Sequence, residues 1–548
     1  MQHTHHHRNG IPARLIWLMN LRALGLFVLT LAASGPAAAG ADDRPLAFNI
    51  DENVAAFFDA LSSGEVGSYA VIGDSISFRG DSYHWFLRDH LEAAFGNGGD
   101  GYLGFNGGFK SNAANGPREG LAYRKQSSVW APSSTSQNLR DALGRRSPDG
   151  IYTRIGGPGW IEVDFYGPSA ILHYVREFGA GNINVELNGK TIATLDASLE
   201  EASDPALGLF SFETGQPDPN VLNTLRLSLI GASTQDPQWT QLNGLQMTTG
   251  NAGAVLNRIA RGGVGPDDFL SADPAIYADV LASLAPQLLI VMLDPGRDDR
   301  FDQYVDDLNS LLDFYEATLP DAGIVLISHH PFRENRELIT IWEIAAASAR
   351  GHGFINLFDL HLDLDDLQAR NMLVDTVHFN ANGGAWHGCY VFDTLRGWNA
   401  AADLAIRAGT IVEGGLYEVR NSDDERLDLA SQFGFLSSAP NVVELEAGFL
   451  LDRVQPDVID VRAEWSINNP LGSVGLRLRN WNTGQFVQIA ATTISQSESI
   501  MELTDIPIDS AFRSNADRVD IRTRVVVVAT FSTSGFRMRV DDLKLRLR

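Results

Sequence analysis

The stretch that most constrains the fold of this chain runs from Ser68 to Ser77 and reads Ser-Tyr-Ala-Val-Ile-Gly-Asp-Ser-Ile-Ser. Its apolar start predicts a buried strand, and the sequence Gly73-Asp74-Ser75 predicts where that strand ends. Because open α/β folds bind their ligands at the carboxyl edge of the sheet, Ser75 is expected at such an edge. Alone, Gly-Asp-Ser predicts only a turn with a capping serine, so a catalytic interpretation needs a base elsewhere in the chain.

Length, charge and cysteine content narrow the class of protein. The 548 residues are enough for about two to four domains. The formal net charge of −26 argues against nucleic acid or an anionic membrane surface as a partner, and it admits a neutral glycan. The single cysteine, Cys389, excludes an intrachain disulfide, and we expect it to pack in the core.

The N-terminus predicts a secretion signal. Arg14 and Arg22 flank the start of an apolar segment, Ala23–Ala33, which Ser34-Gly35-Pro36 ends. Small residues at 37–39 follow, so we expect cleavage near Ala39. The alternative is a membrane anchor, but the apolar run is short for a bilayer span. We therefore expect an extracytoplasmic protein, secreted or periplasmic, with no membrane span after cleavage.

Strands and helices alternate in two parts of the chain. Residues 47–61 and 83–95 predict helices on either side of the strand that leads to Ser75. Apolar runs at 288–293, 324–328 and 354–358 predict further buried strands, with an amphipathic helix after the first. This alternation predicts a parallel sheet covered on both faces. The segment 96–102 is too rich in glycine for a regular element and is expected to be a loop.

Two other parts of the chain predict β structure. From about residue 151, apolar and polar residues alternate, and Asn188-Gly189 predicts a two-residue hairpin. We interpret this part as an inserted β-sandwich. From about Gly414 the alternation returns and predicts a separate antiparallel domain. Trp465 and Trp481 in that domain are interpreted as core aromatics, with a sugar platform as the alternative.

A base for Ser75 can be sought among the histidines, since a nucleophilic serine needs a proton acceptor. Among the base candidates, only His378 has a carboxylate three residues before it, at Asp375. That spacing lets the carboxylate fix the imidazole tautomer. His329 and His330 follow a predicted strand, where either a pocket position or a structural hydrogen bond would explain them. The acidic pairs, such as 306–307 and 365–366, are interpreted as solvated helix faces, because a calcium site needs tighter ligand spacing.

Gly-Asp-Ser after the first strand and Asp-x-x-His after the last, in this order, resemble the SGNH (GDSL) hydrolase superfamily. The resemblance covers about residues 66–397 without the β insertion, and it implies a flavodoxin-like three-layer α/β fold. It also implies that Ser75 is the nucleophile, His378 the general base and then acid, and Asp375 the residue that orients the imidazole. No metal and no cofactor are implied.

The resemblance further implies three donors for an oxyanion hole. The first is the backbone N–H of Ser75, and the second is that of a glycine, here Gly262 or Gly263. The third would be an Asn side chain, but the corresponding stretch, 293–297, reads Leu-Asp-Pro-Gly-Arg. Loss of one donor costs on the order of 3 kcal/mol in a working site. Either Arg297 or a loop Asn substitutes for it, or the enzyme is slow or inactive. The further pocket candidates are Asp74, Arg297 and His330.

A second resemblance is architectural. A glycine-rich stretch, Gly98–Gly101, followed by a β module is similar to bacterial peptidoglycan O-acetylesterases. It implies a carbohydrate-binding-like insertion and an acetylated glycan as substrate. The alternatives are an acyltransferase with the same triad and a catalytically decayed glycan-binding protein, which the missing Asn motivates.

The predicted organisation follows from these patterns. It comprises a signal peptide (1–39), an SGNH hydrolase domain in two parts (40–120 and 251–408), an inserted β-sandwich (121–250) and a C-terminal β-sandwich (409–548). The predicted function is that of a secreted serine esterase that removes O-acetyl groups through an acyl-serine intermediate. The oligomeric state is not predicted.

Overall fold

The computed structural model describes most of the chain between Arg44 and Leu547. The described residues are 44–105, 123–125, 129–130, 146–148, 153–156, 159–201, 203–230, 239–295, 298–333, 336–361, 363–400, 403–408, 410–413, 427–430, 441–451, 458–467, 472–493, 499–507, 510–512, 519–529 and 537–547. The predicted signal peptide and Arg297 lie outside them. No helix within these ranges is long and apolar enough to cross a lipid bilayer.

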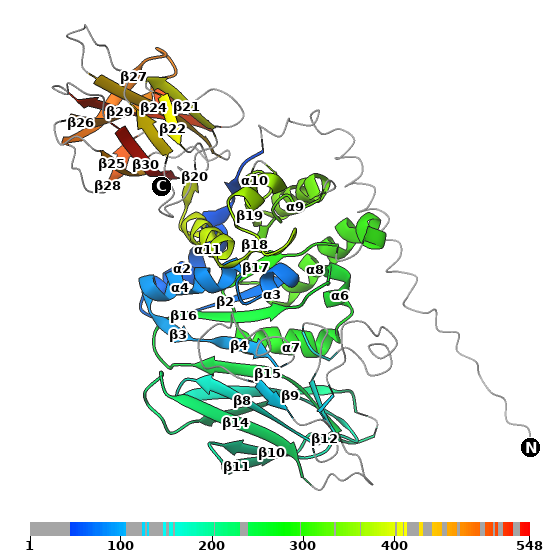
Figure 1. The fold of residues 1–548 in the computed structure, drawn as a ribbon. Coiled ribbons are helices and arrows are strands. Elements are labelled where there is room, and N and C mark those ends of the chain that lie inside the picture. Colours follow the sequence, from blue (N-terminus) through cyan, green and yellow to red (C-terminus); the bar gives the residue numbers. More distant parts are fainter. Residues whose placement is uncertain are drawn as a thin grey trace, which may run out of the picture. The chain divides into compact units, whose positions relative to one another are not determined.

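Parallel strands form the centre of the largest sheet (Figure 1). In spatial order they are β16 (Gly253–Ala260), β2 (Val66–Gly73), β17 (Leu288–Met292), β18 (Gly323–Ile327) and β19 (Gly353–Ile355). All four neighbouring pairs in this series are parallel. Of these strands β2 comes first in the chain and β16 second, so the series has the order of flavodoxin-like sheets. The predicted α/β class is confirmed.

Helices cover both faces of this sheet. Successive side chains of a strand point to opposite faces, so one strand contributes to two apolar cores. On β2, Tyr69 and Val71 join one apolar core, whereas Ala70 and Ile72 join another. The helices that contribute to the first core are α2 (Ile50–Ser62), α4 (Tyr83–Phe95) and α11 (Ala381–Leu395). Those of the second core are α7 (Pro274–Leu284), α8 (Tyr304–Thr318) and α9 (Arg336–Arg350). The shorter helices are α3 (Ser75–Phe78), α6 (Pro266–Leu270), α10 (Leu364–Ala369) and the 3-10 helix Asp298–Gln303.

The first predicted helix begins later than expected. Residues Ala47–Phe48 form β1, which pairs antiparallel with β19, and the helix starts at Ile50. Asn49 lies between them with a left-handed backbone (φ 52°), so the chain turns sharply before the helix. Residues 47–48 therefore pair with the edge of the sheet and do not join the helix that the sequence pattern predicts for them.

The glycine-rich segment 96–102 is not a loop, contrary to the prediction. It contains β3 (Asn97–Gly99) and the start of β4 (Gly101–Gly104), which both pair with β16. Gly101 has φ 63°, and a Cβ atom there would overlap the carbonyl oxygen of Leu256 on β16. The glycines thus allow the backbones of β4 and β16 to approach closely. This explains why the segment does not have the composition of an ordinary strand.

The described residues between β4 and β16 lie mainly in strands, as predicted, and β15 pairs with β4, so it extends the α/β sheet. The predicted hairpin is confirmed: Asn188 (φ 51°) and Gly189 (φ 78°) link β10 and β11. One sheet contains β5 (Tyr123–Lys125), β8 (Trp160–Tyr166), β10 (Ile183–Leu187), β11 (Lys190–Leu195) and β14 (Leu222–Leu229). The others are β6 (Val129–Trp130), β7 (Thr153–Gly156), β9 (Ser169–Phe178), β12 (Ser198–Leu199), β13 (Ala206–Glu213) and β15 (Trp239–Thr248).

The described residues of the C-terminal part form mainly two antiparallel sheets that share one apolar core. One sheet contains β20 (Trp398–Ala400), β22 (Thr410–Glu413), β23 (Leu427–Ala430), β25 (Val458–Ile467), β28 (Ser499–Pro507) and β30 (Arg537–Leu547). The other contains β21 (Asp403–Ala408), β24 (Asn441–Leu451), β26 (Gly472–Arg479), β27 (Phe486–Thr493) and β29 (Val519–Ala529). Trp465 lies in the shared core, and Trp481 is half-buried under the Arg479 guanidinium. The boundaries of all predicted domains stay predictions.

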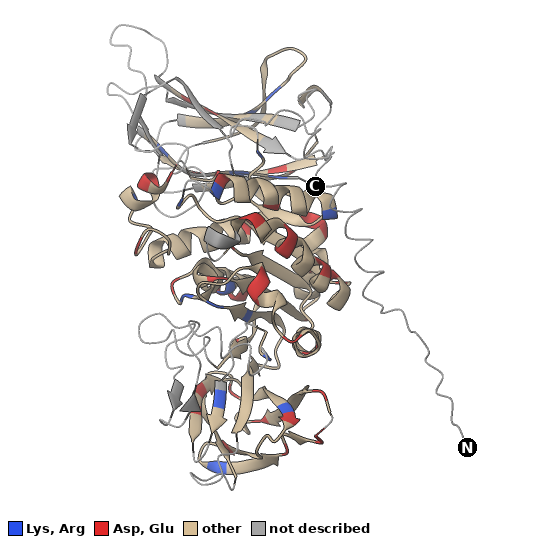
Figure 2. Ribbon diagram, turned by 90° about the vertical axis from the view of Figure 1, so that its right-hand side faces the viewer, with Lys and Arg blue, Asp and Glu red and all other residues tan. Residues whose placement is uncertain are grey.

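Acidic residues lie on many helices of the α/β region (Figure 2). Asp306 and Asp365 are exposed on α8 and α10, which agrees with their interpretation as solvated helix faces. Cys389 is half-buried on α11 and not in the core as expected.

The strand at Gly101 generates a stability prediction. Gly64 also has a positive φ (74°), but its Cβ position is open, so Gly64→Ala should cost only about 1 kcal/mol of backbone strain. Gly101→Ala adds overlap with the Leu256 carbonyl and should cost about 1–3 kcal/mol more. Thermal unfolding of both variants measures the difference, and equal melting temperatures would contradict the close packing described for β4.

Candidate active site

Ser75 lies on a sharp turn at the carboxyl edge of the parallel sheet. β2 ends at Gly73, Asp74 caps the helix, and Ser75 is the first residue of α3. The Asp74 Oδ1 atom accepts a hydrogen bond from the backbone N–H of Ile76 at 2.9 Å. A Cβ atom at residue 73 would overlap the side chain of Ser77, so the chain can turn this tightly only with glycine there.

His378 and Asp375 lie on a loop that its own hydrogen bonds hold in place. Leu373 forms a bridge with Phe379 across the loop. Asp375 Oδ1 accepts hydrogen bonds from the backbone N–H groups of Val377 and His378, both at 2.8 Å. At the end of the loop Asn380 caps α11 by accepting from the N–H of Gly383. The imidazole therefore projects from a loop fixed on both sides.

The structure brings Ser75, His378 and Asp375 together in one hydrogen-bonded chain. His378 Nε2 lies 2.9 Å from Ser75 Oγ, and His378 Nδ1 lies 2.8 Å from Asp375 Oδ2. Because a carboxylate only accepts, Nδ1 carries the proton and Nε2 offers its lone pair to the serine hydroxyl. Partial burial raises the pKa of Asp375, but hydrogen bonds from the His378 ring and from two backbone N–H groups outweigh it and lower the pKa to about 2. Asp375 is therefore ionised at neutral pH.

Gly262 is the predicted glycine donor that lies beside the serine. A Cβ atom on Gly262 would be 3.6 Å from Ser75 Cβ, in ordinary contact. The Cβ position of Gly263 faces open space. The neighbouring N–H of Arg261 donates to the Gly73 carbonyl at 3.1 Å, which continues the pairing of β16 with β2 up to the serine turn.

Asp294 lies in the stretch 293–297, where the resemblance calls for an Asn that the sequence lacks. It follows β17 and forms an ion pair with Arg336 of α9. A carboxylate paired with a guanidinium can accept hydrogen bonds but cannot donate one to an oxyanion. The predicted substitute, Arg297, lies outside the described residues.

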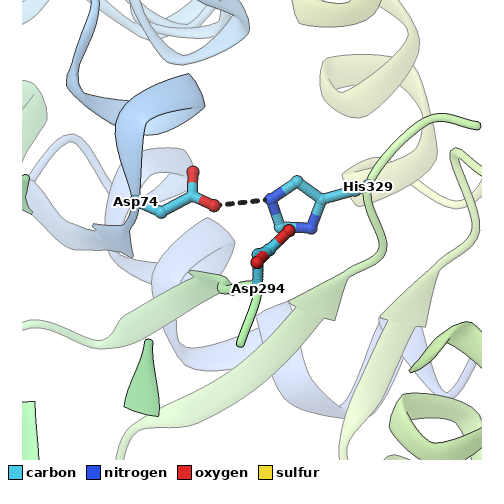
Figure 3. Close-up of side chains that lie close together, drawn as sticks. All are labelled: Asp74, Asp294 and His329. Carbon is cyan, nitrogen blue, oxygen red and sulfur yellow. Dashed lines mark hydrogen bonds and ion pairs between the residues drawn. The ribbon is translucent and has the colours of Figure 1, made fainter. Parts of the chain in front are cut away.

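A second imidazole–carboxylate pair, which the sequence analysis did not predict, lies behind the serine turn (Figure 3). His329 Nε2 is 2.8 Å from Asp74 Oδ2, and both side chains are buried. Polar atoms of Asp74, Asp294 and His329 lie within 4.8 Å of one another, so this group is the candidate metal site among the described residues. The separation of 2.8 Å is that of a hydrogen bond, and Arg336 already neutralises Asp294, so a proton fits the group better than a metal ion.

Burial lowers the pKa of His329, but attraction to Asp74 and the hydrogen bond with it outweigh burial and raise the pKa above its ordinary value. The predicted pocket residue His330 differs. Neither of its ring nitrogens has a hydrogen-bond partner in the described part of the chain. The centroid of its ring lies 4.6 Å from that of Phe379, and burial holds its pKa well below the usual range. Of the two histidines, His329 contacts the serine turn. The sequence did contain one signal for this group, because Asp74, Asp294 and His329 each follow the end of a parallel strand.

A buried carboxyl, Glu343 of α9, lies next to this group. Burial raises its pKa to about 8, although His329 and Arg336 lower it. Tyr304 Oη lies 2.8 Å from Glu343 Oε1 and 2.8 Å from the Leu293 carbonyl oxygen. Glu343 is therefore largely neutral at neutral pH and adds no negative charge to the group.

No protein-family model matches the sequence, and no curated protein matches it. Solved structures similar to the chain include a peptidoglycan O-acetylesterase (15% identity, 63% of this chain and 94% of that chain covered, TM-score 0.48). They also include the acetyl xylan esterase Est2A from the rumen bacterium Butyrivibrio proteoclasticus (12%, 50% and 98%, TM-score 0.21). A third is a carbohydrate esterase family 2 enzyme with a carbohydrate-binding domain from Corynascus thermopiles (13%, 46% and 97%, TM-score 0.22).

Glu343 generates a prediction of how stability changes with pH. Its folded pKa of about 8 exceeds the usual 4.5, so between these values the folded protein holds a proton that the unfolded chain has lost. Stability from this group therefore falls as pH rises through that window. Glu343→Gln keeps an acceptor for Tyr304 and does not titrate. The melting temperature of Glu343→Gln relative to wild type should thus rise between about pH 5 and about pH 8.

The matched control is Glu337→Gln, which removes an exposed carboxyl from the same helix. Its melting temperature relative to wild type should not show this rise. A difference for Glu343→Gln that is the same at both pH values would contradict a buried neutral carboxyl.

Proposed function

We propose that this protein is a serine esterase that removes O-acetyl groups from a carbohydrate or a peptidoglycan-like glycan. The observation that carries the proposal is the continuous chain of contacts from Ser75 Oγ through the His378 ring to Asp375, with separations of 2.9 and 2.8 Å. These are the contacts that a base-activated serine nucleophile needs.

In the proposed first half-reaction, Ser75 Oγ attacks the acetyl carbonyl carbon while His378 Nε2 takes the hydroxyl proton. The tetrahedral intermediate collapses when the sugar oxygen leaves, and His378 returns the proton to it. This step leaves the acetyl group on Ser75. Water then attacks the acyl carbon with His378 again as base, and acetate and the free serine are released. Asp375, ionised at neutral pH, stabilises the imidazolium that forms in both halves.

The negative oxygen of each intermediate needs donors. The backbone N–H groups of Ser75 and Gly262 are the proposed pair, since Gly262 lies beside the serine, and Gly263 is the alternative in the next register. The third donor expected from the resemblance is missing, because the stretch 293–297 contains no Asn. We propose Arg297 as its substitute. Without one, the lost donor would slow the reaction by an amount worth about 3 kcal/mol.

The proposal of a glycan substrate rests on two points. The chain resembles glycan O-acetylesterases in its motifs and in its strand-rich insertion. The net charge of −26 suits a neutral sugar better than a polyanion. We also propose that the protein acts outside the cytoplasm, on the basis of the N-terminal signal pattern.

Ser75→Ala tests the nucleophile. Hydrolysis of a chromogenic acetyl ester and acetate release from acetylated glycans should fall by about 10⁴-fold or more. The matched control is Ser77→Ala, which removes a buried hydroxyl from the same turn, where Ser77 Oγ contacts Tyr83 Oη at 3.3 Å. Ser77→Ala should retain activity within about tenfold. Equal losses in two variants that both keep the wild-type melting temperature would contradict a nucleophilic role for Ser75.

Asp375→Asn tests the orientation of His378. The amide still accepts from the backbone N–H of His378, but its NH₂ group favours the wrong imidazole tautomer, so kcat should fall by up to about 10⁴-fold. Asp363→Asn is the control, because Asp363 also accepts a backbone N–H, that of Asp366, at the start of α10. Steady-state kinetics decide: similar kcat values for the two variants would contradict the proposed role of Asp375.

A further inference from the structure

Asp74 uses its two carboxylate oxygens for two different contacts. Oδ1 accepts from the Ile76 N–H at 2.9 Å and so caps the helix that begins with Ser75. Oδ2 contacts His329 Nε2 at 2.8 Å (Figure 3). Asp74 directly follows β2, whereas His329 follows Ser328, the first residue after β18. One side chain thus links the serine turn to a neighbouring strand end.

The serine turn depends on this cap more than a longer helix would. α3 has only four residues, too few for a helix that is stable by its own hydrogen bonds. Its direction therefore follows from the cap and from contacts with neighbouring elements. A rotation of the Asp74 carboxylate would change the position of the Ile76 N–H, and with it the position of Ser75 one residue earlier.

We propose that His329 is a positioning residue for Ser75, which it holds through Asp74. The inference rests on the proposed function, because it assigns a role in the same site. In this role the imidazole neither contacts substrate nor accepts the serine proton. It donates Nε2–H to Asp74, so that the other oxygen stays aimed at the serine turn.

The charges around His329 favour this role over a metal site. Asp74 and Asp294 contribute two negative charges, Arg336 one positive charge, and Glu343 is largely neutral at neutral pH. The raised pKa of His329 shifts it toward the cationic form, which would balance this buried group, whereas a divalent ion would leave it positive. Without a donor at His329, a buried oxygen of Asp74 would have no partner among the described residues, and an unpaired polar atom costs far more when buried than when exposed. His330, the next residue, has no hydrogen-bond partner within the described ranges and cannot take over this role from its observed position.

The test compares His329→Gln with His329→Asn. The Gln amide nitrogen can reach the place of imidazole Nε2, whereas the shorter Asn cannot, and both variants lack the charge. We expect His329→Asn to lower kcat by about tenfold to a hundredfold on an acetyl ester, with KM within about twofold, because a misplaced nucleophile slows the reaction without weakening binding. His329→Gln should restore most of kcat. The control is His361→Gln, which removes another buried histidine that hydrogen-bonds to His387 at 2.7 Å.

A second readout is the rate at which a fluorophosphonate labels Ser75, since it needs no acetylated substrate. Slow labelling of His329→Asn, normal labelling of His329→Gln and turnover by wild type would support both the positioning role and the proposed function. Wild type that is labelled but hydrolyses no acetyl ester, with His329→Asn again slow, would support positioning and overturn the esterase proposal.

Wild-type rates of labelling and turnover in His329→Asn would overturn the positioning role and leave the esterase proposal intact. Equal losses of kcat and of melting temperature in His329→Asn, His329→Gln and His361→Gln would also overturn it, in favour of a merely structural histidine. Wild type that is never labelled at Ser75 would overturn both proposals.

Discussion

The tight turn from β2 into α3 is the feature on which the candidate site depends. The side chain of Ser77 folds back over residue 73 and leaves no space for a Cβ atom there. Hydrogen bonds of the Asp74 N–H with the Met292 carbonyl of β17, and of the Gly73 carbonyl with the Arg261 N–H, hold the turn between two neighbouring strands. Ser75 therefore has a place defined by the sheet. The loop that carries His378 must reach that place.

Two imidazole–carboxylate pairs flank this turn. The pairs differ in how deeply they are buried, and this difference suits different proposed roles. In the first pair, the His378 side chain is 21% exposed and that of Asp375 is 49% exposed. In the second, the side chains of His329 and Asp74 are 2% and 8% exposed. A proton on the first pair can be exchanged with a substrate or with water. The second pair is almost fully enclosed, so its charges interact more strongly in a low-dielectric setting, which suits the proposed positioning role.

The parts of the site that the sequence could predict are those encoded locally. Ser75 lies in one short motif and Asp375 and His378 lie in another, and the order of the two motifs in the chain carries the resemblance that predicts their roles. The cluster of Asp74, Asp294 and His329 could not be found this way, because it depends on which strands are neighbours in the sheet. Strand order is set by packing between distant segments, and the alternation of elements along the chain leaves it undetermined.

The fold shows the same division between local and distant information. The α/β alternation, the hairpin at Asn188–Gly189 and the buried position of Trp465 follow from short patterns. The strand at Gly101 was predicted as a loop because the segment is rich in glycine. Its glycines allow β16 to approach closely, and this contact is not visible in the sequence of the strand itself. β15 likewise continues the sheet of the α/β region, a pairing that strand periodicity alone does not reveal.

The most direct test of the central claim is to quench the protein rapidly while it turns over an acetyl ester. The masses of its peptides are then measured. Our account predicts that the mass of one acetyl group is found on the peptide that contains Ser75, and that it accumulates when deacylation is slowed. Turnover with no acetylated serine at position 75, or with the acetyl group on another residue, would contradict the account.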